Sequence, residues 1–547
     1  MHNRRAFIKT ATGVAAGTSL AGCTSTFGGD ELENHEPVGP FELPIPNRSA
    51  NPANVDAFNL IADQLGEIGI QIDLNTMEVA AWVEALLSDP QDSVVNRWSR
   101  TGSPDRIDPF VFLNENLHSQ GIGEGTLNHA YYSDDEMDQM IEDSNVETDE
   151  EARRELVNDI QEKFGEDVPY IMSEFENVLG VANNEWEGWE AFPGTELLHN
   201  RISLTEISPT TDASRVVKAQ TQTVDRLNWG NFSDSSIHSQ VNVAFDSLVQ
   251  LWYDGSPQPA LATEWEWSDD TTLEVTLRDD ITFHDGEPIT AEDVKFTYEI
   301  VDEWAHGQYQ SLVQQISEIE AVDEQTVRFN LEDPAAYLVR VTLSQVTIAP
   351  KHVWEDVDDP AQVSDPDYTG SGPLKVTEFG SEQIRYEVHD DYYRDYDFDE
   401  YVVQVYGAES AAIGDVESGT ATFYQSPGPT EFTRLQEVDS VTTIEQPTVS
   451  LQAFCMNNSV EPFDDRTLRQ ACAHAIDQEA IVQTAYQNFR VPAVGQTFIA
   501  PINEDWRHPD PVTYEGGAEE ARSILEDTGY VWNDDEQLMR PSEETEE

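Results

Sequence analysis

Acidic side chains far outnumber basic ones in this chain, and that imbalance restricts how it can fold. The chain has 106 Asp and Glu against 29 Lys and Arg, a formal net charge of -77. Such a chain repels itself strongly at a Debye length of about 8 Å, and salt near 1 M shortens that length to about 3 Å. We therefore expect a solvated coat of carboxylates suited to a halophilic source. The charge excludes a nucleic-acid-binding protein, because little could neutralise phosphates.

Length and composition indicate a multidomain protein with hydrophobic cores. At about 150 residues per domain, 547 residues allow roughly three domains. Aromatic residues make up 10% of the chain, which argues against disorder. Three cysteines are too few for a disulfide framework, and we expect Cys455 and Cys472 to be core residues.

The first 23 residues resemble an export signal. Arg4 and Arg5 form a twin arginine, and the apolar stretch that follows is shorter than the roughly 20 residues of a bilayer span. The ending Leu-Ala-Gly-Cys resembles a lipobox, in which Cys23 becomes the lipidated N-terminus. We expect a twin-arginine lipoprotein signal over residues 1–22 and a flexible tether over 23–37. The body would then sit at the extracellular face of the cell membrane.

The body alternates predicted strands with amphipathic helices. Period-two patterns and apolar runs predict strands over 70–74, 216–219, 273–277, 326–331, 385–388 and 401–405. Apolar residues at helical spacing predict helices over 54–68, 150–164, 290–300 and 465–488. This mixture favours α/β or α+β layers over more than one core.

Motifs of catalysis are absent. The chain has no phosphate-binding glycine loop, nucleophile elbow or His-Glu-x-x-His. The stretch 390–401 is acidic and aromatic but lacks the ligand pattern of a calcium loop, so we interpret it as a turn before a strand. We therefore expect no enzyme, no metal and no cofactor. A secreted, tethered protein of several lobes without catalytic motifs is typical of one that captures a small molecule.

Several blocks then resemble a known family. The segment 259–294, with Glu-Trp-Glu-Trp-Ser at 264–268 and Phe-His-Asp-Gly-Glu at 283–287, looks like the signature of family 5 extracellular solute-binding proteins. These are the oligopeptide, dipeptide and nickel binders of ABC importers. Later blocks agree in order: 349–354, 370–376, 462–477 and 518–530. With the acidic composition, the resemblance implies a halophilic archaeal member.

The resemblance implies an α/β, bilobed, type II periplasmic-binding-protein fold with an inserted domain, but in a rotated order. Blocks resembling 51–74 and 98–109 follow the 529–530 region in the family, whereas here they stand near the N-terminus. We interpret this as a circular permutation that joins the family's natural ends near residues 205–215. The alternative is a rearranged gene model or a fusion of fragments. Lobe two would be 38–172 and 453–547, lobe one 173–254 and 367–452, and the inserted domain 255–366. Crossovers near 172–176 and 451–458 would form the hinge.

The implied function is capture of a small solute, peptide-like or other, between two lobes and its delivery to an ABC permease. The protein would be a monomer held at the membrane through Cys23, with no nucleic acid as partner. Two alternatives stay open. An exported hydrolase could hide a carboxylate pair in the acidic background, and a surface ligand sensor would need no permease.

The resemblance places ligand contacts on both lobes. On lobe two, Trp98 would cover the ligand, Arg100 would meet a carboxylate, and Asp105 an amine. Peptide-binding relatives usually carry an aspartate where this chain has Thr101, so peptide specificity is open. The lobe-one and hinge candidates are Asn228, Trp229, Asn231, Tyr424, Gln425 and Asn457. The alternative for all of these residues is packing, capping or a solvated surface.

Overall fold

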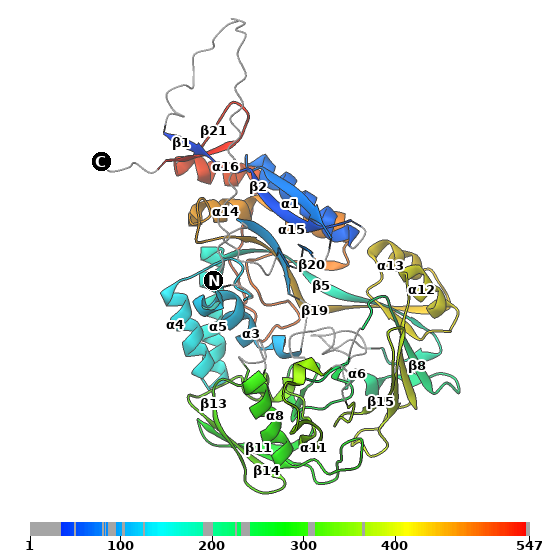
Figure 1. Ribbon diagram of the computed structural model, residues 1–547. Coiled ribbons are helices and arrows are strands. Elements are labelled where there is room, and N and C mark those ends of the chain that lie inside the picture. Colours follow the sequence, from blue (N-terminus) through cyan, green and yellow to red (C-terminus); the bar gives the residue numbers. More distant parts are fainter. Residues whose placement is uncertain are drawn as a thin grey trace, which may run out of the picture.

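A computed structural model describes most of the chain (Figure 1). The described residues are 34–48, 51–78, 81–82, 84–85, 94–100, 104–123, 126–189, 201–224, 227–230, 241–304, 312–363 and 367–542. The predicted export and lipidation residues Arg4, Arg5 and Cys23 lie outside them, as do Thr101 and Asn231. No helix in the described ranges is long and apolar enough to cross a membrane.

A mixed sheet forms the middle of the molecule. Among the described residues it has nine strands, in the order β15-β16-β17-β8-β18-β5-β19-β4, with β20 added against β5. Their bounds are β15 Leu374–Phe379, β16 Gln383–Val388, β17 Glu400–Val405, β8 Arg215–Gln220, β18 Phe423–Gln425, β5 Tyr170–Asn183, β19 Val441–Met456, β4 Val95–Arg100 and β20 Arg490–Pro492. Only the pairings of β8 with β17 and β18 are parallel within this sheet. The predicted strands at 216–219, 385–388 and 401–405 are confirmed.

Two long strands, β5 and β19, connect the two halves of the molecule (Figure 1). They pair antiparallel from Val441 opposite Asn183 to Cys455 opposite Tyr170. One end of β5 contributes Ile171 to one hydrophobic core, and its other end contributes Ala182 to a separate core. Most of β5 and the 448–456 part of β19 are buried, as expected for strands covered on two faces.

A four-stranded antiparallel sheet and one long helix make up residues 262–331. The strand order is β11-β12-β14-β13, with β11 Ala262–Asp269, β12 Thr272–Leu277, β13 Ile316–Ala321 and β14 Thr326–Leu331. The alternating sequences of β12 and β14 bury every second side chain, which confirms both predicted strands. The helix α8, Ala291–Trp304, begins after Thr290, whose N–H and hydroxyl both donate to Asp293 Oδ2.

The other half is mainly helical. Helix α1, Pro52–Glu67, connects the two strands of a parallel pair, β2, Phe41–Pro46, and β3, Ile72–Met77. Around them lie α4 Asp135–Val146, α5 Glu150–Asp167, α14 Arg466–Ala475, α15 Gln478–Ala485 and α16 Gly517–Asp527. The predicted helix 465–488 was wrong in its length. It is two helices, because the Asp477 carboxylate accepts the Ala480 N–H and begins a new helix. Cys455 and Cys472 are both buried, as predicted.

Short elements complete the described chain. The strands are β6 Trp186–Glu187, β7 Ser208–Pro209, β9 Val249–Leu251 and β10 Pro257–Pro259. The helices and turns are η2 Pro104–Ile107, α3 Phe110–Phe112, η3 Leu113–Leu117, η4 Ser119–Gly121, α6 Ser203–Glu206, α10 Thr342–Gln345, α11 Lys351–Trp354, η5 Pro360–Gln362, α12 Glu409–Glu417 and α13 Pro429–Leu435.

The two ends of the described chain lie side by side. A three-stranded sheet joins β1, His35–Pro37, to β22, Leu538–Pro541, and β21, Val531–Trp532. The N–H and the hydroxyl of Ser542 both donate to the Asn34 carbonyl, at 2.8 Å. Figure 1 shows this sheet at the end of the molecule opposite β11 and β14.

Candidate functional site

The two halves meet at a contact face formed by short loops. Gly255, in the turn between β9 and β10, approaches Ile107 so closely that a Cβ would lie 2.5 Å from Ile107 Cγ2. The φ of Gly255 is +76°, so the position favours glycine for conformational as well as steric reasons. The rings of Phe110 and Tyr337 stack with their centroids 3.4 Å apart. Both contacts join the helical half to the half that contains β11 to β14.

Polar contacts add to this face. The Ala336 N–H donates to the Asn145 carbonyl at 3.0 Å, and Arg340 pairs with Glu150 at 3.2 Å. The first contact binds backbone to backbone, so it does not depend on side-chain identity. The two halves therefore touch through apolar, backbone and charged groups.

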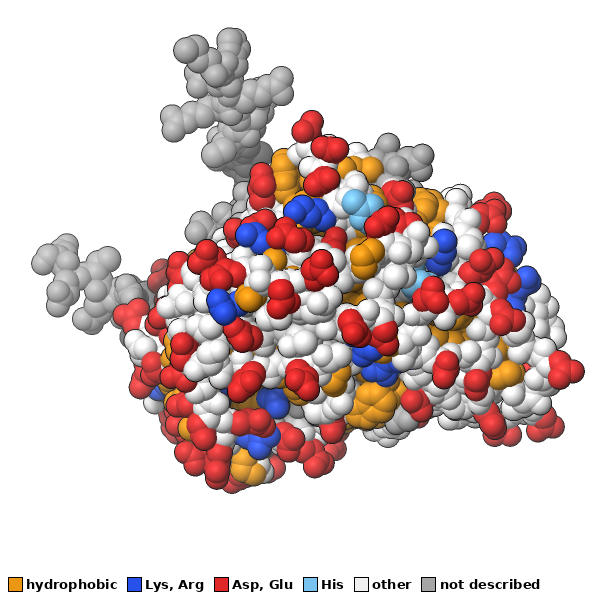
Figure 2. All heavy atoms as spheres, turned by 90° about the horizontal axis from the view of Figure 1, so that it is seen from below, with side chains coloured by type: hydrophobic (Ala, Val, Ile, Leu, Met, Phe, Trp, Pro, Cys, Tyr) orange, Lys and Arg blue, Asp and Glu red, His pale blue; other side chains and the backbone are white. Residues whose placement is uncertain are grey.

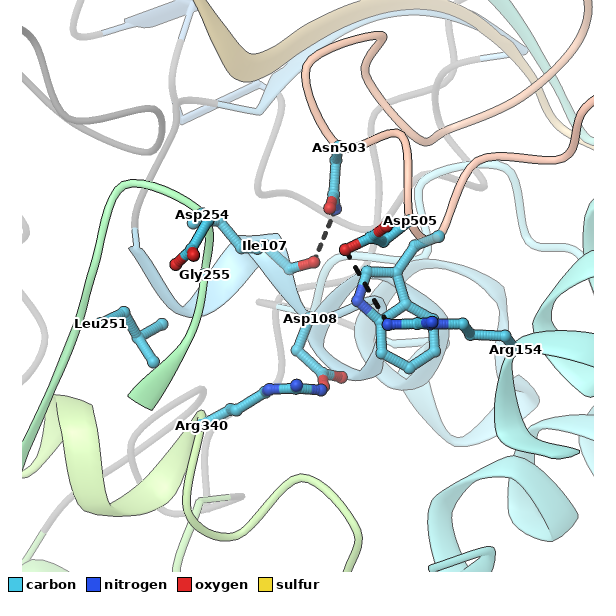
Figure 3. A pocket seen from close by; sticks show the side chains of 10 residues that line it. Ile107, Asp108, Arg154, Leu251, Asp254, Gly255, Arg340, Asn503 and Asp505 are labelled. Atoms are coloured by element: carbon cyan, nitrogen blue, oxygen red, sulfur yellow. Dashed lines mark hydrogen bonds and ion pairs between the residues drawn. The ribbon is translucent and has the colours of Figure 1, made fainter. Parts of the chain in front are cut away.

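Figure 3 shows a small pocket at this face, with room for about one water molecule. Its lining residues come from both halves: Ile107, Asp108, Arg154, Leu251, Asp254, Gly255, Arg340, Asn503, Asp505 and Trp506. Asn503 donates from Nδ2 to the Ile107 carbonyl at 2.6 Å, and Arg154 lies 3.8 Å from Asp505. The pocket is too small for a solute, so it marks the junction of the halves.

A buried ion pair holds the loop next to this pocket. The Asp108 carboxylate accepts two hydrogen bonds from Arg153, both at 2.7 Å, and one from the Phe110 N–H at 2.9 Å. Burial alone would raise the pKa of Asp108, but Arg153 outweighs burial and the net shift is downward. The carboxylate therefore stays charged and fixes the turn between η2 and α3, which follows the candidate Asp105 in the chain.

A larger cavity, of about 310 Å³, lies beside the same β9–β10 hairpin. Its described lining residues are Trp252, Gln258, Pro259 and Arg394. Hairpin residues Leu251, Asp254 and Gly255 line the small pocket, so one hairpin contributes to both spaces. This volume is in the range of small-molecule sites. Sequence reasoning missed Trp252 and Arg394, although the aromatic stretch around Arg394 was noted.

The structure places the lobe-two candidates at one sheet edge and the turn that follows. In β4, Trp98 lies opposite Ala453 and Arg100 opposite Leu451 of β19. Asp105 lies in η2. Asp105 thus lies two positions before Ile107 of the contact face, and the ligand contacts of all three residues stay predictions.

The lobe-one candidates Asn228 and Trp229 are buried and satisfied by other protein groups. Asn228 donates from Nδ2 to the carbonyls of Pro360 and Val363, at 2.9 and 3.1 Å. Trp229 donates from Nε1 to the Thr347 carbonyl at 3.2 Å and packs beside Phe245 and Trp354. These contacts agree with the packing alternative, and the structure does not test a ligand contact.

The remaining candidates lie on the central sheet. Tyr424 and Gln425 are in β18, where burial and then Glu409 raise the pKa of the Tyr424 phenol. Asn457 follows β19 and accepts the N–H and hydroxyl of Ser459 on Oδ1, at 3.0 and 2.7 Å. Asn457 thus closes the turn after the strand. Its role and those of Tyr424 and Gln425 in ligand binding stay predictions.

Comparisons with known proteins agree on one family. The model of the family described as bacterial extracellular solute-binding proteins, family 5 Middle, matches residues 256–546, more than half of the chain. The dipeptide-binding protein DppE of Bacillus subtilis is 26% identical over 314 residues, which are 52% of this chain and 56% of that protein. The dipeptide-binding protein of Escherichia coli is 26% identical over 299 residues, 50% of this chain and 55% of that protein. The chain thus spans about half the length of the curated relatives it matches.

Solved structures show the same fold. An ABC transporter substrate-binding protein, CtaP of Listeria monocytogenes, is 24% identical, with a TM-score of 0.50 over 59% of this chain and 66% of that one. A periplasmic oligopeptide-binding protein of Thermotoga maritima is 22% identical, with a TM-score of 0.52 over 59% of this chain and 63% of that one. The predicted α/β fold of the type II periplasmic-binding-protein kind is confirmed.

Proposed function

Because this chain belongs to the family 5 extracellular solute-binding proteins, we propose that it captures a small solute between two lobes and delivers it to an ABC importer permease. The single observation that carries the proposal is the face where loops of both halves meet, beside a cavity of about 310 Å³. The relatives named as dipeptide-binding favour a peptide-like solute. The protein releases its solute unchanged, since the family consists of binding proteins and not of enzymes.

The crossing strands supply the hinge in this proposal. Lobe one comprises 173–254 and 367–452, lobe two 38–172 and 453–547, and residues 255–366 form the inserted domain. The hinge segments 172–176 and 451–458 then fall on or directly after β5 and β19, which contribute to cores on both sides. A ligand that contacts both lobes favours the closed form by its differential affinity.

Ligand capture predicts stabilisation without turnover. Protein purified in 2 M KCl and incubated with a pool of short peptides should gain stability as RT ln(1 + [L]/Kd), about 2.7 kcal/mol when the free ligand is at 100 Kd. Thermal unfolding measures the gain, and mass spectrometry identifies the peptide that is retained. Peptide cleavage under the same conditions would support the hydrolase alternative and contradict capture. A solute that binds but never enters cells carrying the neighbouring permease would favour the sensor.

We also propose that the chain is a circular permutant of its family. The support is the sheet of β1, β21 and β22, which brings Asn34 to hydrogen-bonding distance of Ser542. A comparison that aligns residues in chain order can match a permuted chain on only one side of the point where the order changes. This limit agrees with the partial matches to relatives of similar fold. The joined natural ends then lie in the exposed connection at 210–212 between β7 and β8.

Restoring the family's order tests the permutation. In that variant a Gly-Ser-Gly linker joins Ser542 to Asn34, and new ends open between Thr211 and Asp212. We expect the same fold, with a free energy of unfolding changed by about 1 kcal/mol, because a short loop replaces another short loop. The matched control opens the chain between Val216 and Val217 inside β8 and should not fold. Failure of the restored-order chain to fold would contradict the proposal.

The proposal also includes the export and lipidation signal expected at the N-terminus. Twin-arginine export through Arg4 and Arg5, followed by lipidation of Cys23, would hold a monomeric protein at the extracellular face of the membrane. The acidic surface suits a salty exterior, as in a halophilic archaeon. Labelling cells with a radioactive lipid precursor tests the anchor, since Cys23→Ser should remove the label and release the protein.

A further inference from the structure

The pairing of β5 with β19 is interrupted where these strands pass from one half of the molecule to the other. The register shifts between Pro447 and Leu451 of β19, where residues 448–450 stand opposite the single residue Glu176 of β5. Extra residues of this kind disrupt the hydrogen-bond ladder and bend the strand. The angle between the two halves is therefore fixed less by this ladder than by contacts beside it.

The segment 486–490 lies beside the interruption. It connects α15 to β20, which pairs with β5. Gln487 and Asn488 both have a left-handed backbone, with φ of +54° and +66°. This conformation is unfavourable for residues with side chains and persists only where the surroundings hold it. The turn is closed by the Phe489 N–H, which donates to the Tyr486 carbonyl at 2.9 Å.

This segment, which we call the strap, reaches α13 in the other half of the molecule. The rings of Phe489 and Phe432 meet edge to face, with their centroids 5.0 Å apart and their planes at 83°. Gln487 donates from Nε2 to Thr430 Oγ1 at 3.0 Å. Phe432 is buried and Phe489 is half-buried. In Figure 1, β20 lies between α15 and α13. The strap therefore joins the helical half to the half that contains α13.

Arg490 fixes the base of the strap to β5. Its guanidinium donates to Glu174 Oε1 and pairs with Glu176 Oε1, both at 2.9 Å. The guanidinium carbon lies 3.8 Å from the centroid of the Tyr486 ring. Gln452 of β19 donates to the same Glu176 oxygen at 2.6 Å. The base of the strap is thus held at the interruption itself, and the strap extends from there to α13.

The strap and the contact face lie at opposite edges of the β5–β19 pair. β20 is hydrogen-bonded to β5, whereas β4, which precedes η2 and α3 of the contact face, is hydrogen-bonded to β19. Phe489 meets Phe432 at one edge, and Phe110 stacks on Tyr337 at the other. The arrangement of the halves is thus held at both edges. A contact at either edge favours it over arrangements in which the halves are further apart.

We propose that the strap is a latch between the two halves, which stabilises the closed arrangement through the contact of Phe489 with Phe432. The proposal rests on the proposed function, in which the lobes move about the hinge, and it adds a determinant of that movement outside the contact face. A larger closed fraction before binding raises the apparent affinity for any solute that requires the closed form.

Hydrogen exchange of one amide measures the separation of the halves without a solute. The Ala336 N–H donates to the Asn145 carbonyl across the contact face, so it exchanges when the halves part. In 2 M KCl, the variant F489A should raise the exchange rate of this amide by about 3- to 10-fold, the effect of losing one aromatic pair. Mass spectrometry of overlapping pepsin peptides gives the rate.

The matched control is F379A, which removes a ring contact with Tyr368 inside lobe one and should leave the Ala336 rate unchanged. Amides of β12, a central strand, report global unfolding, and circular dichroism confirms that both variants are folded. If Ala336 exchanges faster than β12 in the wild type but no faster in F489A, the latch is overturned and solute capture stands. An equal increase in F379A also overturns the latch. If Ala336 exchanges no faster than β12 in the wild type, the halves do not separate, and lobe closure in the proposed function fails with the latch.

Discussion

Replacing Glu174 by glutamine is expected to lower the free energy of unfolding by about 3–5 kcal/mol, because it leaves buried arginines without their counter-charge. Glu174 lies in β5 and is fully buried. Its Oε1 accepts hydrogen bonds from Arg97 of β4 and from Arg490 of β20, the latter at 2.9 Å. Arg97 is only 1% exposed, so water cannot replace the lost charge.

The same network sets a pH dependence. Burial alone would raise the pKa of Glu174, but Arg97 and Arg490 outweigh burial, so the pKa in the folded protein lies below the ordinary value of 4.5. A carboxyl whose folded pKa is depressed contributes stability above its unfolded pKa. That contribution is lost as the pH falls from about 4.5 through the folded pKa. Wild-type stability should therefore decrease over this range, and the decrease should be smaller in E174Q.

Urea unfolding in 2 M KCl measures both effects at constant ionic strength. The control is E431Q, which removes one partner of an exposed pair, Glu431 and Arg434, and should cost less than about 1 kcal/mol. Unfolding of E174Q within 0.5 kcal/mol of the wild type, on the order of the usual surface effect, would contradict a structural role for the network.

Raising the KCl concentration from 0.1 M to 2 M is expected to raise the melting temperature by on the order of 10 °C. The net charge is -77, and Figure 2 shows Asp and Glu side chains spread over the face in view, with few Lys and Arg among them. Salt shortens the distance over which these carboxylates repel, and the folded state gains most because it holds them closest together.

A control with sucrose at equal osmolality separates two effects of KCl: the screening of charge, and the exclusion of the solute from the protein surface. Sucrose also strengthens apolar burial but does not screen charge, so its effect on the melting temperature should be clearly smaller than that of KCl. Scanning calorimetry at fixed protein concentration makes the comparison. A melting temperature that does not change with KCl would show that surface repulsion is not limiting, and would remove the physical basis for a high-salt habitat.

Local patterns predicted many elements well, because their signals lie within a few residues. The alternation at 273–277 and 326–331 corresponds to β12 and β14, and the cap at Thr290 begins α8. The helix predicted over 465–488 was wrong because apolar spacing continues across Asp477, where a side-chain hydrogen bond ends one helix and begins another. Periodicity records which side chains face the core and does not record where the backbone turns.

Site residues were harder to predict than elements. Asn228 and Trp229 attract attention as polar and aromatic loop residues, yet their hydrogen bonds go to carbonyls more than 100 positions away. Whether a side chain has a partner depends on residues distant in sequence.

The sequence by itself determined the class of this protein: its acidic composition, its family blocks and most of its strands and helices. These features depend on composition and on short-range patterns. Only the tertiary structure decided which residues meet across the chain. It paired β1 with β22 and placed Glu174 between Arg97 and Arg490. The physical reason is that hydrogen bonds and ion pairs form between neighbours in space, and the fold selects those neighbours.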